Sequence, residues 1–361
     1  MDFLIITIVA ILTTTCSIPP TIYLAKKFGL VDDPKKRPHP AHIHQITIPR
    51  AGGIPIFIGI AFGIGLFVPL DKHIIGILLA CLLLLVNGIL DDIWINYSPY
   101  PRLIIQILAA LIVVASGVGI SFITNPLGGI LNLDQIIIPF NFLGSHKIVV
   151  IADILAIIWI VWMMNMINWS KGIDGQMPGM ATVTGIILGL LSLKFYFNGD
   201  TNQLHIAILS FILAGTTLAF MVFNWYPAKI FPGFSGSNII GFMIAVLSIL
   251  SGGKLATAGL VLLVPATDFI YTFLRRILQK KSPFFADRKH LYHKLLDKGL
   301  KPPQIALFYI LGSAILGALA LSLNSQGKLF AVVLVSIIIL GTILWLNFFG
   351  HLSKPPDQDN G

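Results

Sequence analysis

Two adjacent carboxylates, Asp91 and Asp92, follow a long apolar run and form the arrangement in the chain that most clearly suggests chemistry. All 15 acidic residues are aspartates, and this pair has no basic neighbour in the local sequence. Neighbouring helical residues point about 100° apart, so one carboxylate can face a cavity while the other braces it or meets a second ligand. A solvated helix end is the simpler alternative, although the C-terminal end of a helix is the negative pole of its dipole.

A second polar cluster follows another apolar run. Asn165 and Asn168 are three residues apart and share one helix face. The loop 169–176 then carries Lys171 and Asp174 beside two glycines, which permit positive φ and a close approach of the backbone to a ligand. A helix end followed by a turn explains the glycines but not the lysine and the aspartate.

Glycine and serine residues open the apolar run at 236–251, after the segment 231–235 (Phe-Pro-Gly-Phe-Ser). Free backbone N–H groups at a helix start can receive phosphate oxygens. The same sequence is also typical of an ordinary helix N-cap by Ser235 or Ser237.

A basic loop at 275–304 contains His290 and His293, spaced i, i+3. This spacing suits a metal if a carboxylate joins the pair, but the interleaved Arg288 and Lys289 favour phosphate binding. Asp268 lies inside an apolar run, where a carboxylate is either functional or braces a partner, and we expect a bracing role.

The elements that must position these residues are membrane helices. The chain has 361 residues, of which 56% are hydrophobic and 11% charged, whereas a soluble domain carries about 25% charged residues. This composition excludes a soluble enzyme, a disordered protein and a nucleic-acid binder. It predicts an all-α polytopic membrane protein that forms a single domain over residues 1–361.

A bilayer core needs about 20 apolar residues per helix, which predicts ten or eleven transmembrane helices. The eleven runs are 3–25, 51–70, 73–90, 103–120, 148–168, 177–197, 204–224, 236–251, 255–274, 305–324 and 329–349. The long connection at 121–147 is not helical, and residues 136–140 can pair as a short hairpin.

Lysine and arginine predict the sides of the membrane. Nineteen of the 24 fall on one side, and the positive-inside rule makes that side cytoplasmic and places the N-terminus outside. The cytoplasmic segments are then the loops 26–50, 91–102, 169–176, 225–235 and 275–304 and the tail from residue 350. Every polar cluster described above lies on this side, which fits a substrate that is both polyanionic and resident in the membrane.

The order and spacing of five motifs, from segment 49–53 (Pro-Arg-Ala-Gly-Gly) to segment 287–293 (Asp-Arg-Lys-His-Leu-Tyr-His), resemble the polyprenyl-phosphate N-acetylhexosamine-1-phosphate transferases. This integral membrane family also contains the phospho-MurNAc-pentapeptide transferase. The last motif is similar to the Asp-Arg-x-His-Leu-His-His of the UDP-GlcNAc branch. The pentapeptide branch has a run of histidines without that lead-in.

The resemblance implies transfer of a sugar 1-phosphate, with GlcNAc-1-phosphate favoured, from a UDP-sugar to undecaprenyl phosphate. UMP is released, Mg²⁺ is required, and the product starts cell-envelope glycan synthesis at the cytoplasmic face of the cell membrane. Asp91, Asp92, His290 and His293 are the implied catalytic residues, and Asp91 and Asp92 are also the implied metal ligands. The implied substrate-binding residues are Arg50, Arg102, Asn168, Lys171, Asp174, Asn224, Phe231, Asp287 and Arg288. Of these, Asn224 and Phe231 match the positions that hold the uracil.

Three residues depart from the family pattern. Lys171 stands where the motif Asn-x-x-Asn-x-x-Asp-Gly-x-Asp-Gly has its first aspartate. Phe234 replaces the aspartate of Gly-Asp-Ser-Gly, which helps to bind Mg²⁺, and Tyr292 replaces a histidine. The change at Phe234 weakens the expected Mg²⁺ site.

Three alternatives stay open at this point. One is the pentapeptide transferase, and another is an inactive relative that binds polyprenyl phosphate, which Lys171 and Phe234 favour. The third is an anion transporter, although transporters place ionisable sites near the midplane and often show repeats, and neither feature is evident. The oligomeric state, a homodimer among the options, also stays open.

Overall fold

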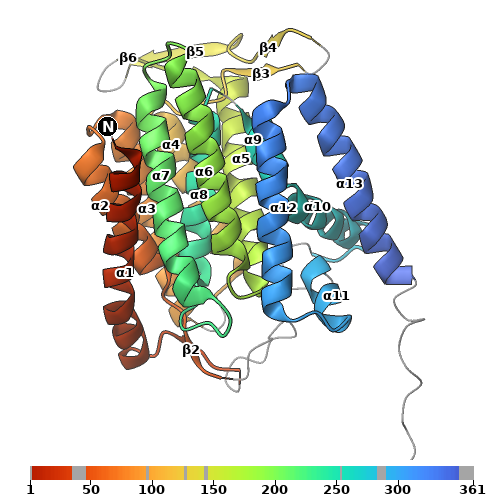
Figure 1. Ribbon diagram of the computed structural model, residues 1–361. Helices are drawn as coiled ribbons and strands as arrows, with labels where there is room; N and C mark the ends of the chain where they lie inside the picture. The colour runs from red at the N-terminus through yellow and green to blue at the C-terminus, as the bar shows by residue number, and fades with distance from the viewer. Residues whose placement is uncertain are drawn as a thin grey trace, which may run out of the picture.

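The computed structural model describes residues 2–34, 46–94, 97–125, 128–141, 145–252, 254–282 and 290–348. They form a bundle of helices with short strands at its ends (Figure 1), which confirms the predicted all-α polytopic membrane class. The helices are α1 (Phe3–Lys27), α2 (Gly53–Phe67), α3 (Lys72–Ile93), α4 (Pro99–Ala115), α5 (Val150–Trp169), α6 (Gln176–Phe197), α7 (Gln203–Asn224), α8 (Gly233–Leu250), α9 (Leu255–Val261), α10 (Leu263–Leu278), α11 (Leu291–Asp297), α12 (Pro302–Ser322) and α13 (Ser325–Phe348), with the 3-10 helix η1 at Ser170–Gly172.

Each of the eleven predicted apolar runs contains a helix. Eight helices within the described ranges are long and apolar enough to cross a membrane: α1, α3, α5, α6, α7, α8, α12 and α13. Two others, α2 and α4, are shorter apolar helices. The count of eleven crossings and the orientation in the membrane stay predictions.

The hydropathy of the run at 255–274 predicts one straight helix. The structure has two helices there instead. Helices α9 and α10 meet at an angle of 87°. Pro265 lies in the first turn of α10, where its missing N–H costs nothing, but its ring would clash inside a continuous helix. The bend directs α10 away from the bundle (Figure 1) and places Asp268 near the segment that leads into α11.

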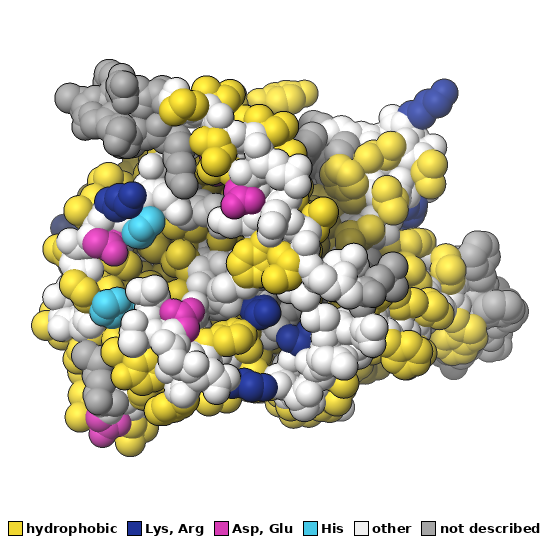
Figure 2. All heavy atoms as spheres, turned by 90° about the horizontal axis from the view of Figure 1, so that it is seen from above, with side chains coloured by type: hydrophobic (Ala, Val, Ile, Leu, Met, Phe, Trp, Pro, Cys, Tyr) yellow, Lys and Arg dark blue, Asp and Glu magenta, His cyan; other side chains and the backbone are white. Residues whose placement is uncertain are grey.

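Short strands close the two ends of the bundle. They are β1 (Val31–Asp32), β2 (Ile48–Pro49), β3 (Phe122–Thr124), β4 (Ile130–Asn132), β5 (Ile137–Asn141) and β6 (Ser145–Val149). The antiparallel pair β5–β6, with Ile137 opposite Val149, confirms the hairpin predicted after residue 136. Strands β3 to β6 lie at one end and β2 at the other (Figure 1), and Figure 2 shows the first of these ends, with apolar side chains around its rim.

Helix α8 is the centre of the bundle, because 94% of its most apolar stretch is buried. Glycines let its neighbours approach closely. A Cβ on Gly88 of α3 would overlap the backbone of Ser235, and a Cβ on Gly53 of α2 would overlap the Ser235 side chain. Both helices therefore pack directly against the first turn of α8, and this contact places the end of α3 beside the start of α8.

This packing makes Gly88 a sensitive position. Gly88→Ala should lower the free energy of unfolding by about 1–3 kcal/mol, because the added methyl meets backbone that cannot move without separating the two helices. The check is the thermal unfolding midpoint of the detergent-solubilised protein. Gly65→Ala is the matched control, because a Cβ on this exposed helical glycine meets nothing within 4 Å. Equal midpoints for the two variants would contradict the packing argument.

Candidate active site

The carboxylate pair lies in the last turn of α3 and is buried, with Asp91 2% and Asp92 1% exposed. A solvated helix end is therefore excluded. Two buried like charges at the negative pole of a helix require positive partners, since an uncompensated buried charge costs several kcal/mol.

Two arginines supply these partners. Arg50, which follows β2, places Nε 2.9 Å from Asp92 Oδ1 and Nη2 3.7 Å from Asp91 Oδ2. Arg102, from the first turns of α4, pairs its Nε with Asp91 Oδ1. Burial acts to lower the pKa of Arg50, but the charges of Asp92, Asp32 and Asp91 outweigh it, so the pKa is raised and the guanidinium stays charged.

The start of α8 supplies a further partner for Asp92. The Phe234 N–H donates to Asp92 Oδ1 at 3.3 Å, and the Ser235 hydroxyl donates to Asp92 Oδ2 at 3.4 Å. The positive pole of α8 thus faces the negative end of α3. The sequence suggests that N–H groups at the start of α8 bind a phosphate, but here the Phe234 N–H binds the Asp92 carboxylate. Gly233 is required here, because its φ is +67° and a Cβ would overlap Asp92.

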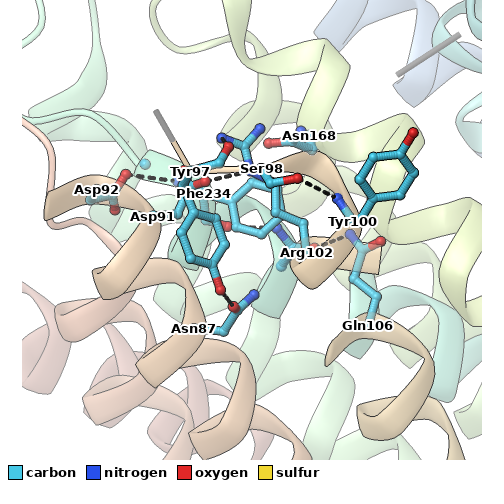
Figure 3. A network of polar contacts seen from close by, with 12 residues as sticks. Asn87, Asp91, Asp92, Tyr97, Ser98, Tyr100, Arg102, Gln106, Asn168 and Phe234 are labelled. Atoms are coloured by element: carbon cyan, nitrogen blue, oxygen red, sulfur yellow. Dashed lines mark hydrogen bonds and ion pairs between the residues drawn. The ribbon is translucent and has the colours of Figure 1, made fainter. Parts of the chain in front are cut away.

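The Phe234 ring lies beside two cations. The Arg102 guanidinium is 5.2 Å and the Lys171 ammonium 5.8 Å from the ring centroid, which are cation–π distances. Lys171 also donates to the carbonyl of Gly233 at 3.1 Å. Figure 3 shows Phe234 in the middle of the polar residues, with Asp91 and Asp92 to one side. The two main departures from the family pattern, Lys171 and Phe234, are thus in contact with each other.

A chain of amide hydrogen bonds supports this site from within the bundle. The Asn165 amide donates to Gln106 at 2.8 Å, and Gln106 donates to Asn238 of α8. Tyr97 donates to Asn87 of α3 at 2.7 Å (Figure 3). Tyr97 and Asn238 were not among the predicted site residues, although polar side chains at the ends of apolar helices are a usable signal.

Asn168, predicted to bind the nucleotide-sugar, lies at the same depth. Its Oδ1 accepts a hydrogen bond from the Ser237 hydroxyl of α8 at 2.8 Å. The structure therefore brings Asn168, Lys171, Arg50, Arg102 and the carboxylate pair to one end of the bundle.

Asn224 connects two loops of the predicted nucleotide site. This buried side chain accepts from the Gly175 N–H at 3.0 Å and donates to the Ile230 carbonyl at 2.9 Å. In the same region Asp174 accepts from the Ala228 N–H at 3.0 Å, and burial raises the pKa of Asp174 despite that bond. Asn224 thus holds the loops together, and its predicted contact with uracil stays a prediction.

Phe231 is tied to the loop that carries Arg50. Its N–H donates to the Pro49 carbonyl at 2.8 Å, and its own carbonyl accepts from the Gly52 N–H at 3.0 Å. The predicted uracil-binding residue and the arginine that holds the carboxylates therefore share one backbone frame.

The sequence suggests that the two glycines of the 169–176 loop open space for a ligand. In the structure they do not. A Cβ on Gly172 would overlap the Tyr292 ring, and a Cβ on Gly175 would lie 2.6 Å from the Trp225 ring. Aromatic rings fill both positions. The positive φ of +78° at Gly175 still requires glycine.

His290 begins α11 and is paired with Asp268. Its Nδ1 lies 2.8 Å from Asp268 Oδ2, and the other oxygen accepts the Leu291 N–H at 2.9 Å. Asp268 therefore braces His290 and the start of α11. His293 is 1% exposed and packs against the Tyr292 ring, with centroids 4.3 Å apart.

The histidines form a cluster of their own. His290 lines a pocket together with Trp169, Gln176, Asp268 and Tyr292, among others. Within the described ranges, no ion pair or hydrogen bond joins either histidine to the carboxylate pair, so their catalytic role stays a prediction. The predicted substrate residues Asp287 and Arg288 lie outside the described residues.

The Mg²⁺ that the resemblance implies stays a prediction, and the side chains gathered here do not fit it. Asp91 and Asp92 are already ion-paired, and Phe234 offers no donor where a further carboxylate would complete a ligand set. In the part of the chain that the structure describes, no three His, Cys, Asp or Glu side chains lie close enough to hold a metal ion.

Comparison with known proteins gives a consistent family. Residues 74–252, which include the carboxylate pair, Arg102, Lys171 and Phe234, match glycosyl transferase family 4. The chain is 29% identical over 315 residues to the "Probable undecaprenyl-phosphate N-acetylglucosaminyl 1-phosphate transferase" of Bacillus subtilis, covering 84% of this chain and 80% of the relative. It is 27% identical over 392 residues to the decaprenyl-phosphate N-acetylglucosaminephosphotransferase of Mycobacterium tuberculosis, covering 99% and 92%. For the undecaprenyl-phosphate alpha-N-acetylglucosaminyl 1-phosphate transferase of Escherichia coli the identity is 29% over 309 residues, covering 82% and 77%. The chain is thus similar to glycosyl transferase family 4 over residues 74–252, and to these three transferases over most of its length.

Proposed function

We propose that this protein transfers N-acetylglucosamine 1-phosphate from a UDP-sugar to a polyprenyl phosphate in the cell membrane and releases UMP. The observation that carries the proposal is the buried pair Asp91 and Asp92, held between Arg50 and Arg102 at the ends of apolar helices. A lipid phosphate and a water-soluble nucleotide can both reach such a position. The names of the relatives in three bacteria support the polyprenyl phosphate acceptor and the N-acetylglucosamine phosphate group.

The reaction needs positioning more than covalent help from the protein. An oxygen of the acceptor phosphate attacks the β-phosphorus of the UDP-sugar, and a new P–O bond forms. The bond from that phosphorus to the bridging oxygen breaks, and UMP leaves with the oxygen. Protein groups contribute by aligning the two phosphates and by neutralising charge in a site with little water.

The arginines are the groups that meet these needs. Each guanidinium has five N–H donors, so a carboxylate partner fixes its plane while other donors remain for phosphate oxygens. We assign to Asp91 and Asp92 the role of holding Arg102 and Arg50 in place.

We place the site on the cytoplasmic side. Strand β2, which leads into Arg50, lies at the end of the bundle opposite β3 to β6, and the N-terminus lies near the latter (Figure 1). Arg50 therefore lies at the end of the bundle whose loops carry most of the lysine and arginine. The positive-inside rule assigns that end to the cytoplasm. UDP-sugars are cytoplasmic metabolites, so the two assignments agree.

Asp92→Asn should lower the rate constant of sugar-phosphate transfer by about a hundredfold or more. The exchange keeps the volume and one acceptor oxygen, but it removes the charge that orients Arg50. The measurement is radiolabelled transfer from UDP-GlcNAc to undecaprenyl phosphate by the purified protein in detergent.

The control is Asp71→Asn, at the opposite end of the same helix. Asp71 caps α3 by accepting the Ile74 N–H at 2.9 Å, and asparagine caps helices equally well. This variant should keep full activity. Near-normal turnover by Asp92→Asn would remove the main support for the proposed function.

Phe231→Ala should raise the KM for the UDP-sugar roughly ten- to a hundredfold, because stacking of a base on an aromatic ring is worth about 1–3 kcal/mol. Steady-state kinetics with varied UDP-GlcNAc measure this. Phe197→Ala, which removes a ring that is 78% exposed at the end of α6, is the control and should leave the KM unchanged. A KM unaffected by loss of Phe231 would place the nucleotide elsewhere.

One alternative is a relative that binds the substrates without transferring the sugar phosphate. Lys171 and Phe234 favour it, since they occupy the position where the family pattern has carboxylates. Such a relative would be folded and would bind the lipid. It would give no product from any UDP-N-acetylhexosamine in the transfer assay.

A further inference from the structure

We propose that Lys171, flanked by Arg50 and Arg102, binds the diphosphate of the nucleotide substrate without a divalent metal ion. The inference rests on the proposed function insofar as it takes a UDP-sugar to be the ligand. It concerns the electrostatics of binding rather than the transfer step.

The first argument is that the carboxylates are already used. Asp92 pairs with Arg50 at 2.9 Å and accepts the N–H of Phe234, while Asp91 pairs with Arg102. A metal ion bound by these oxygens would have to displace a guanidinium. It would also stand among positive charges, and like charges at about 4 Å repel by several kcal/mol near a protein surface.

The second argument is the aromatic ring at the start of α8. Phe234 is 3% exposed and has no lone pair to give to a metal. Its ring instead attracts cations, with Arg102 at 5.2 Å and Lys171 at 5.8 Å from the centroid. The residue thus holds two protein cations where a carboxylate would hold an ion.

The third argument is that Lys171 has no carboxylate of its own. Its one hydrogen bond within the described residues goes to the neutral carbonyl of Gly233, at 3.1 Å. It lies in electrostatic range of four charges, those of Arg50, Asp92, Asp91 and Arg102. These four groups are paired with one another, and Asp32 adds a further negative charge near Arg50.

Within the described residues Lys171 is therefore a cation without an ion-pair partner of its own. A half-buried ammonium with a neutral acceptor and two guanidinium neighbours is unfavourable, and a phosphate oxygen relieves this cost. An ammonium has three donors, of which Gly233 uses one, so two remain to reach a diphosphate. Charge-assisted bonds of this kind are the strong ones.

The test measures equilibrium binding of UDP to the full-length protein in detergent by isothermal titration calorimetry. One series contains excess EDTA and the other contains Mg²⁺ at millimolar concentration. We expect the two dissociation constants to agree within about twofold. Lys171→Met should weaken binding about ten- to a hundredfold in EDTA, the range for a hydrogen bond to a charged group. Lys171→Arg should recover most of the affinity.

Lys254→Met is the matched control. Lys254 also lies over a phenylalanine ring, 5.4 Å from the centroid of Phe195, but at the start of α9. Its loss should leave UDP binding unchanged. The same effect from both lysine variants would show a general loss of fold or charge, and would overturn the assignment.

A complementary variant combines Lys171→Asp with Phe234→Asp. It adds two carboxylates beside Asp91 and Asp92 and removes the unpaired cation. UDP binding by this variant should require Mg²⁺. Metal-independent binding by the double variant would contradict the roles given to these two positions.

Wild-type binding of UDP that needs Mg²⁺, or full affinity in Lys171→Met, would overturn the inference. Transfer from UDP-GlcNAc in Mg²⁺ buffer is measured on the same preparation and tests the proposed function separately. Binding in EDTA without transfer would refute the transferase and leave the diphosphate site supported. Transfer together with metal-dependent UDP binding would support the transferase and refute the inference.

Discussion

The burial of two adjacent carboxylates at the end of α3 is the constraint on which this end of the molecule depends. Two like charges at the negative pole of a helix are stable there only if positive groups surround them. Arg50, Arg102 and the first turn of α8 meet that need from three different parts of the chain. The close contact of Gly88 with Ser235 is what allows α8 to take part.

The same constraint links the carboxylate pair to the loops that are predicted to bind the nucleotide. Arg50 lies on a loop whose backbone is hydrogen-bonded to Phe231. Asn224 in turn connects the loop that contains Phe231 to the loop that carries Asp174. Direct hydrogen bonds therefore connect the backbone of Phe231 to the loop that carries Arg50, and Arg50 is paired in turn with Asp92. The hydrogen bonds between the two loops are made by backbone groups, and the Arg50 side chain is held by the carboxylates.

Sequence reasoning succeeds where a single physical cause dominates. Apolar runs predict the helices, because a spanning segment must satisfy its own backbone in lipid. Basic loops also gather Arg50, Arg102 and Lys171 on one side before any contact is known. The bend between α9 and α10 escapes this reasoning, since the run is apolar on both sides of it and only Pro265 marks the break. The bracing by Asn224 and the ring packing over Gly172 and Gly175 escape it too, because they depend on partners far away in the chain.

Lys171 and Phe234 are best understood as one unit rather than as two separate changes. A lysine at position 171 beside an aspartate at 234 would form a closed ion pair with no affinity left for phosphate. A phenylalanine at 234 beside an aspartate at 171 would leave a buried carboxylate near Asp91 and Asp92 with too few cations. With lysine and phenylalanine together, the ring face holds the ammonium and the Arg102 guanidinium without adding a negative charge of its own. The Lys171 ammonium then remains beside the start of α8, whose Phe234 N–H is already donated to Asp92.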